Sequence, residues 1–185
     1  MRPAPRQRRV CDNAGMKPFI VLSHGLESGP DATKVSALAR VAAPLGFESV
    51  RPDYRDLDGT RDVGRIDARI ERLKRHVPAD RPVLLAGSSM GAFISGLASL
   101  EVDCVGLFLI ALPVDIGGYR RRFDARRVPT AIVHAWDDEL CPAHAVVEFA
   151  RGRGDTLTLV RDDHRLGAHV DFVAQQFQQF LGRFA

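Results

Sequence analysis

The chain has 185 residues, of which 45% are apolar and 26% charged, and its net charge is +3. This length suits one domain with a sizeable core, and the longest apolar runs fall short of the roughly 20 residues that a membrane-spanning helix needs. The composition therefore predicts a globular protein and excludes a membrane-embedded one.

The excess positive charge lies in residues 1–15, which carry four Arg and one Asp, while residues 16–185 are balanced. The high isoelectric point therefore belongs to a tail, and it does not predict a nucleic-acid-binding surface on the domain. We expect residues 1–15 to be an over-extended start, a disordered arm or a short targeting segment, and residues 16–185 to form one domain. Three cysteines without paired or metal-ligand spacing predict a reducing, cytoplasmic setting and no metal site.

Continuous aliphatic runs alternate with amphipathic segments along the chain, which is typical of a parallel sheet buried on both faces. In the first half we expect strands over 18–25, 47–54 and 82–88, and helices over 31–45, 60–77 and 90–100. The 60–77 segment has apolar residues at helical spacing from Val63 to Val77, and we expect its Arg and Glu side chains on the surface.

In the second half we expect strands over 104–113, 129–136 and 156–162, and helices over 142–151 and 168–184. Only about 15 residues separate the fourth strand from the fifth, which leaves no room for a cap domain. The sequence therefore predicts an α/β fold, a three-layer α/β/α sandwich with about six mostly parallel strands.

The stretch "VLLAGSSMGAF" places two serines between two glycines, directly after an aliphatic strand. In the pattern GxSxG the glycines are Gly87 and Gly91, so the central serine is Ser89 and Ser88 is its variable neighbour. Small residues at these two positions allow a sharp strand-to-helix turn that exposes the serine. A serine hydroxyl is a weak nucleophile that needs a positioned base, so Ser89 is a candidate nucleophile.

Candidate partners follow the fifth and sixth predicted strands. The loop "HAWDDELCP" offers Asp137 and Asp138, and Asp115 follows the fourth strand as an alternative acid. The loop "RDDHRLGAHV" offers His164, immediately past the strand, and His169, which reads as the start of the last helix. His134 lies inside the fifth strand, where a hydrogen-bonded core histidine is the simpler interpretation.

Together these residues resemble the α/β-hydrolase superfamily from about Lys17 to the C-terminus, and "SHGLESGPDATK" is similar to the opening of small, lid-poor bacterial esterases of the YqiA type. The resemblance implies a minimal α/β-hydrolase fold and a catalytic set of Ser89, Asp138 and His164, with Asp138 selected by its place four residues before Pro142. It also implies an oxyanion hole from the backbone N–H groups of Leu26 and Met90. Two departures are Leu26, where Phe is common, and Ala135, where Gly usually follows the strand histidine.

The implied reaction is hydrolysis of a small-molecule acyl ester or thioester through an acyl-enzyme, with no metal or organic cofactor. Substrate contacts are expected from His24 and Gly25, with an acyl pocket lined by Val114, Ile116 and Tyr119. Arg120, Arg121 and Arg122 either meet an anionic leaving group or form a solvated basic face. A peptidase or amidase of the same fold, a catalytically silent binding protein and a chance motif on another doubly wound fold remain as alternatives.

Overall fold

The computed structural model of the chain describes residues 16–59 and 62–185, so the expected tail at 1–15 lies outside the described residues. Its centre is a six-stranded sheet in the order β2-β1-β3-β4-β5-β6, and every neighbouring pair is parallel. The strands are β1 (Phe19–Ser23), β2 (Ser49–Val50), β3 (Val83–Ser88), β4 (Cys104–Ile110), β5 (Thr130–Ala135) and β6 (Thr156–Val160). Because all strands are parallel, their carboxyl ends meet at one edge.

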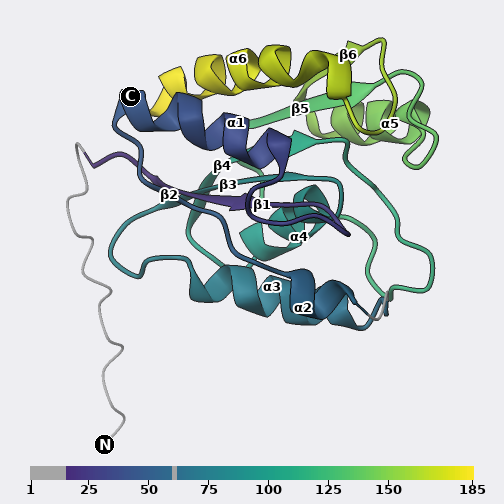
Figure 1. Ribbon diagram of the computed structural model, residues 1–185, viewed down its shortest axis with the longest axis horizontal. Coiled ribbons are helices and arrows are strands. Elements are labelled where there is room, and N and C mark those ends of the chain that lie inside the picture. The colour runs from purple at the N-terminus through teal and green to yellow at the C-terminus, as the bar shows by residue number, and fades with distance from the viewer. Residues whose placement is uncertain (1–15, 60–61) are drawn as a thin grey trace, which may run out of the picture.

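Helices cover both faces of the sheet and complete the predicted three-layer sandwich (Figure 1). The helices are α1 (Thr33–Ala42), α2 (Arg55–Asp58), α3 (Arg65–Arg75), α4 (Met90–Ser99), α5 (Ala143–Arg153) and α6 (Val170–Leu181). Three short 3₁₀ turns, at Ala43–Leu45, Gly167–His169 and Gly182–Phe184, extend α1 and flank α6. Helices α1 and α6 lie on one face, while α3 and α4 lie on the other.

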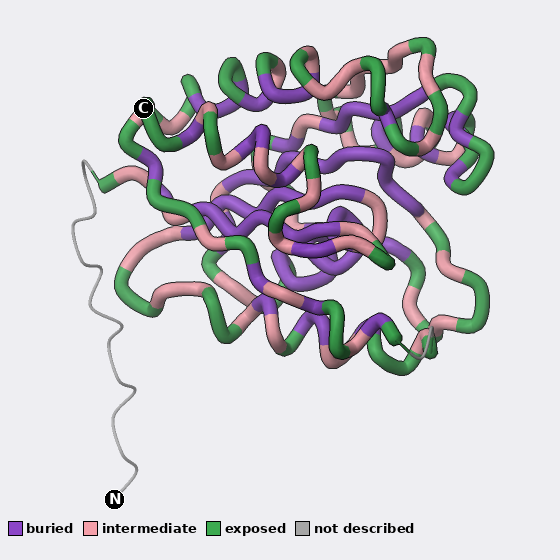
Figure 2. Tube along the Cα trace, in the orientation of Figure 1, coloured by how far each residue is buried: buried purple, intermediate pink, exposed green. Residues whose placement is uncertain are grey.

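Two hydrophobic clusters, one on each face of the sheet, hold these layers together. One joins α3, α4 and α5 to the sheet and the other joins α1 and α6 to it. Strand β3 contributes side chains alternately to both clusters, and all six of its residues are buried. Figure 2 shows the buried trace concentrated in the central strands and α4. The strand that leads into the GxSxG turn is therefore buried along its whole length.

The segment between β2 and β3 differs from the expectation. The predicted strand over 47–54 pairs only at Ser49–Val50, and a short helix that the sequence did not predict, α2, follows at Arg55–Asp58. The predicted 60–77 helix is present as α3, which begins at Arg65 and ends at Arg75. The Asp62 Oδ1 accepts a 2.8 Å hydrogen bond from the Gly64 amide, a local turn that competes with helix formation and delays the start of α3.

The connection between β4 and β5, residues 111–129, contains no helix or strand, which confirms the absence of a cap domain there. In residues 16–59 and 62–185, no helix combines the length and apolar character needed to cross a membrane.

Candidate active site

Ser89 occupies a sharp turn between β3 and α4, as the glycine pattern predicts. Its φ of 53° lies in the left-handed region, where a non-glycine residue is strained. A Cβ on Gly87 would lie 2.3 Å from the Gly91 carbonyl oxygen, and a Cβ on Gly91 would lie 2.0 Å from that of Ser23. Neither distance is physically possible, so both glycines are required for the turn to pack against its neighbours.

The structure brings Ser89, His164 and Asp138 into one hydrogen-bonded line at the carboxyl edge. The Ser89 Oγ lies 3.0 Å from His164 Nε2, across 75 residues of sequence. The His164 Nδ1 lies 2.8 Å from Asp138 Oδ2 and 2.9 Å from Oδ1. This is the geometry in which a carboxylate holds an imidazole tautomer that can accept a hydroxyl proton.

The acid loop after β5 distinguishes Asp138 from its neighbour Asp137. The Asp138 Oδ1 accepts backbone hydrogen bonds from Leu140 (3.0 Å) and Cys141 (2.7 Å), and Asp138 is buried. Asp137 and Asp115 are both exposed, Asp115 in the loop after β4, and neither carboxylate is hydrogen-bonded to an imidazole of the described residues. The amide donors fix the orientation of the Asp138 carboxylate.

His134 supports the acid loop from inside β5. It is fully buried, and its Nε2 donates a 2.8 Å hydrogen bond to the Cys141 carbonyl and lies 3.5 Å from Asp138 Oδ2. The expectation of a hydrogen-bonded core histidine is therefore correct. The ring also faces the same carboxylate oxygen as His164, which sequence spacing alone does not indicate.

Asp138, Cys141 and His164 offer donor atoms that lie within 4.8 Å of one another, the spacing of a potential metal-ligand set. Burial raises the pKa of the Cys141 thiol to about 12, so this thiol is protonated without a metal ion. The carboxylate and the imidazole of this set are hydrogen-bonded to each other.

The loop that carries His164 is held by α1. The Lys34 Nζ donates a 2.5 Å hydrogen bond to the Arg165 carbonyl, and Leu166 is fully buried with a φ of 51°. The Nδ1 of the alternative histidine, His169, lies 2.8 Å from Asp162 Oδ2, and this ring is not hydrogen-bonded to Ser89. Lys34 belongs to the stretch that carries the family resemblance, but its place in the sequence does not predict this contact with the histidine loop, 131 residues away.

The two expected oxyanion-hole donors lie on either side of the Ser89 turn. Met90 is the first residue of α4, so its amide has no partner within the helix. Leu26 lies in the loop after β1, and its amide donates no backbone hydrogen bond to any described residue. A Cβ on Gly25 would lie 3.5 Å from the Ser89 Cβ and 3.3 Å from the Ser88 carbonyl oxygen, so this loop lies directly against the turn.

His24 lies at the start of the loop after β1 and is buried, with 1% of its surface exposed. Its Nδ1 donates a 2.8 Å hydrogen bond to the Gly25 carbonyl, and its Nε2 accepts one of 3.0 Å from the Tyr54 amide. These bonds select the neutral ring with the proton on Nδ1. His24, which was expected to contact the substrate, is therefore buried, whereas Gly25 lies directly against the Ser89 turn.

A buried ion pair holds the same loop. Arg69 of α3 is 1% exposed, donates a 2.8 Å hydrogen bond to the His24 carbonyl, and pairs with Asp58 of α2. Its guanidinium also stacks on the Tyr54 ring at 4.5 Å. The expectation that every charged side chain of this segment lies on the surface is wrong for Arg69, because Asp58 and the His24 carbonyl provide partners inside the fold.

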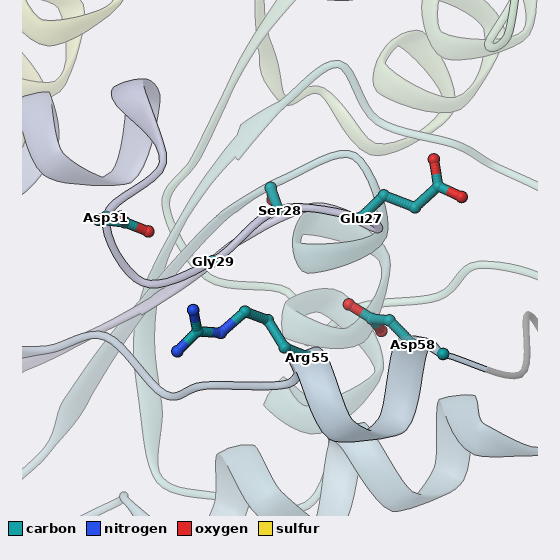
Figure 3. Close-up of a pocket in the computed structure, with 7 residues that line it drawn as sticks. Glu27, Ser28, Gly29, Asp31, Arg55 and Asp58 are labelled. Carbon is teal, nitrogen blue, oxygen red and sulfur yellow. The ribbon is translucent and has the colours of Figure 1, made fainter.

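Two cavities open at the carboxyl edge. The larger, about 480 Å³, lies between the loop after β1 and α2, and Figure 3 shows its polar lining. The smaller, about 130 Å³, lies between the loops after β4 and β5, and its lining includes Val114. Ile116 and Tyr119 line neither cavity, since both pack against the core beside α3 and α4.

The basic stretch after Tyr119 forms surface ion pairs. The Tyr119 hydroxyl donates a 2.7 Å hydrogen bond to Asp67 of α3, where Arg120 also binds at 3.0 Å. Arg121 lies 3.6 Å from Glu101. These pairs favour the solvated basic face over contact with an anionic leaving group.

The two buried histidines predict a pH-dependent stability. Burial lowers the pKa of both His24 and His134. At His24, the hydrogen bond to the Gly25 carbonyl and the charges of Asp58 and Asp53 oppose this shift, and Arg69 adds to it. At His134, the hydrogen bond to the Cys141 carbonyl and the charge of Asp138 oppose it, and His164 adds to it. The unfolded chain binds a proton at each ring near pH 6.5 and the folded chain does not. The free energy of unfolding should therefore fall between pH 7 and pH 5, by up to about 1.4 kcal/mol per pH unit for each histidine.

Urea unfolding at pH 7, 6 and 5 measures this dependence. His134→Gln should reduce the slope, whereas His144→Gln, at an exposed position of α5, should leave it unchanged. An equal slope in the wild type and the His134→Gln variant would contradict the assignment of His134 as a buried neutral ring.

The chain is similar to several solved structures. A protein of Xanthomonas campestris pv. campestris assigned to the alpha/beta superfamily of hydrolases is 45% identical, with a TM-score of 0.86 over 90% of this chain and 99% of that one. The mouse alpha/beta hydrolase domain-containing protein 10 is 16% identical, with a TM-score of 0.72 over 92% of each chain. A lidless serine hydrolase of Xanthomonas campestris is 18% identical, with a TM-score of 0.64 over 93% of this chain and 84% of that one.

The two more distant similarities concern the fold alone, whereas the 45% identity spans nearly the whole of the related protein. No protein-family model matches the chain, and no curated protein sequence matches it.

Proposed function

Because the chain belongs to the α/β-hydrolase superfamily, we propose that it is a serine hydrolase that cleaves a small ester or thioester through Ser89, His164 and Asp138. The observation that carries the proposal is the continuous hydrogen-bonded line from the Ser89 hydroxyl through His164 to the buried Asp138 carboxylate. In this line, His164 Nε2 can accept the proton of the Ser89 hydroxyl while Nδ1 donates to the Asp138 carboxylate, as activation of a serine requires.

In the first half of the reaction, the Ser89 Oγ forms a bond to the substrate carbonyl carbon and its proton passes to His164 Nε2. The tetrahedral intermediate collapses as the carbon–oxygen or carbon–sulfur bond to the leaving group breaks. The leaving group takes the proton from His164, and the acyl group remains on Ser89. The negative Asp138 stabilises the imidazolium that forms between these two transfers.

In the second half, His164 takes a proton from a water molecule whose oxygen bonds to the acyl carbon. The bond from that carbon to Ser89 Oγ then breaks, and the oxygen regains its proton from His164. Both tetrahedral intermediates carry negative charge on the former carbonyl oxygen. The amides of Leu26 and Met90 are the proposed donors to this oxygen, and the N-terminus of α4 adds a favourable dipole.

An activity-independent test uses a fluorophosphonate, which phosphonylates an activated serine without requiring the natural substrate. Intact-mass analysis should show one adduct on the wild type and on Ser88→Ala, and none on Ser89→Ala. Ser88 is the matched control because it lies beside Ser89 on β3, and its side chain has no place in the proposed line. A panel of esters, thioesters and amides then separates esterase from peptidase activity.

The absence of an adduct on folded wild-type protein would contradict the proposal and favour a binding protein on a hydrolase scaffold. Loss of the adduct in Ser88→Ala and its retention in Ser89→Ala would show that the nucleophile is misassigned.

A further inference from the structure

The candidate nucleophile lies between the strand ends that border two cavities, a larger one lined mostly by polar residues and a smaller one lined mostly by apolar residues. In the strand order β2-β1-β3-β4-β5-β6, Ser89 follows β3, the polar cavity follows β1 and β2, and the smaller cavity follows β4 and β5. An ester has two halves that diverge from the carbonyl carbon. The two sides of Ser89 therefore offer separate places for the acyl group and the alcohol.

The smaller cavity has an apolar lining. Leu112, Val114, Leu140 and Val146 contribute to it, and Leu140 is 69% exposed at its surface. Its wall includes Cys141, whose amide binds Asp138, so the cavity borders the acid loop directly. A volume of about 130 Å³ holds roughly four groups the size of a water molecule, at about 30 Å³ each. This space suits a short acyl chain.

The polar cavity borders the loop that carries the proposed oxyanion donor. Ser28 lines it and donates a 2.9 Å hydrogen bond to the carbonyl of Gly25, the residue beside Ser89. Asp31 and Arg55 line its outer part. Its volume of about 480 Å³ lies in the range of small-molecule sites, roughly 300 to 1,000 Å³.

Asp58 contributes a buried carboxylate to the inner side of this cavity. Its side chain is 6% exposed, and Figure 3 shows the carboxylate directed from α2 toward the loop after β1. Its Oδ1 pairs with Arg69, while its Oδ2 and the Arg69 Nε are buried without a hydrogen-bond partner among the described residues. Both atoms are shielded from the cavity, so the hydrogen-bonding groups that a ligand can reach are those of exposed lining residues such as Asp31 and Arg55.

Charged groups of both signs line this cavity. Arg55 is paired with Asp53 at 2.6 Å and Asp58 is paired with Arg69, while Glu27 and Asp31 add two further carboxylates to the lining. The lining therefore offers carboxylate oxygens that accept hydrogen bonds and a guanidinium that donates them. Hydroxyl groups, which do both, match this lining.

From these two cavities we infer that the substrate is an ester of a short acyl chain, about four carbons or fewer, with a polyhydroxylated alcohol of monosaccharide size. The inference rests on the proposed function and extends it to the substrate class. The acyl group lies toward Val114 and Val146, and the alcohol lies toward Asp31 and Asp58.

A matched pair of acetates tests the alcohol half. Glucose 6-acetate and cyclohexylmethyl acetate share the acyl group and a six-membered ring, and only the former carries hydroxyl groups. We expect kcat/KM to be at least tenfold higher for the sugar ester. Asp31→Leu should lower this ratio at least fivefold, whereas Asp171→Leu, which removes an exposed carboxylate from α6, should leave it unchanged.

A chain-length series of 4-nitrophenyl esters tests the acyl half. The butanoate should be hydrolysed at least tenfold faster than the octanoate, measured as kcat/KM. Ala145→Phe places a large side chain in the smaller cavity and should lower the butanoate-to-acetate ratio at least tenfold. Val147→Phe, at a half-buried position of α5 outside the lining, is the control and should preserve the ratio.

The fluorophosphonate adduct distinguishes failure of this inference from failure of the proposed function. The cavity assignment is wrong if the wild type hydrolyses cyclohexylmethyl acetate as fast as glucose 6-acetate, or the octanoate as fast as the butanoate. If the same protein forms the adduct, the assignment of Ser89 as the nucleophile is unaffected. If no adduct forms, the proposed function fails, and this inference fails with it.

Discussion

Replacing Asp138 by Asn should lower kcat for 4-nitrophenyl acetate about 10⁴-fold, the loss typical of a serine triad held in the wrong tautomer. The reason lies in the acid loop. The amides of Leu140 and Cys141 both donate to Oδ1, so the Asn oxygen must take that position and its NH₂ group must replace Oδ2. That NH₂ faces His164 Nδ1 at 2.8 Å and donates to it.

The His164 proton is then forced onto Nε2, which points at the Ser89 hydroxyl and no longer accepts its proton. Asp137→Asn is the matched control, because Asp137 is the exposed neighbour in the same loop, and kcat should change less than threefold. Thermal unfolding of both variants separates loss of chemistry from loss of fold. Comparable losses of kcat in the two variants would show that the acid is misassigned.

Replacing Arg69 by Met should lower the free energy of unfolding by about 3–5 kcal/mol, because the change leaves the buried Asp58 carboxylate without its counter-charge. For a domain of this size the melting temperature should fall by roughly 6–20 °C. The variant also loses the hydrogen bond to the His24 carbonyl, so the loop that carries Leu26 loses an anchor. We therefore expect kcat to fall even where the variant is fully folded.

Two further variants make the Arg69 result interpretable. Arg120→Met removes an ion pair whose side chains are 72% and 44% exposed, and such a pair contributes at most about 1 kcal/mol. The double variant Arg69→Met with Asp58→Leu removes both buried charges and should recover much of the lost stability. A single Arg69→Met variant as stable as the wild type would contradict the buried pair.

The convergence of Ser89 and His164 at one edge of the sheet could be predicted from the sequence because each signal is local. Ser89 lies between two glycines in one strand-to-helix turn, and His164 lies in the first loop past an aliphatic run. In a parallel sheet the ends of such runs converge, so order along the chain is enough to bring them together. Asp138 needed the family resemblance, because the amide donors that distinguish it from Asp137 are visible only in the folded loop.

Arg69 could not be predicted in this way. It lies between Ile66 and Ile70 on α3, and periodicity assigns apolar residues to the buried face and an arginine to solvent. Its partners are Asp58, on a helix that the pattern did not predict, and the His24 carbonyl, 45 residues away. Burial of a charge depends on such distant partners, and hydrophobic periodicity contains no information about them.

The purely parallel sheet has a consequence for how the chain reaches its native state. Each parallel pair needs a crossover connection, and β1 pairs with β3 only after the chain between them has returned across the sheet. Such long-range pairings form slowly. A folding intermediate that lacks β6 would contain the serine turn but not the histidine that follows β6. Recovery of ester hydrolysis during refolding would therefore follow the docking of the last strand, whereas helical circular dichroism would return earlier.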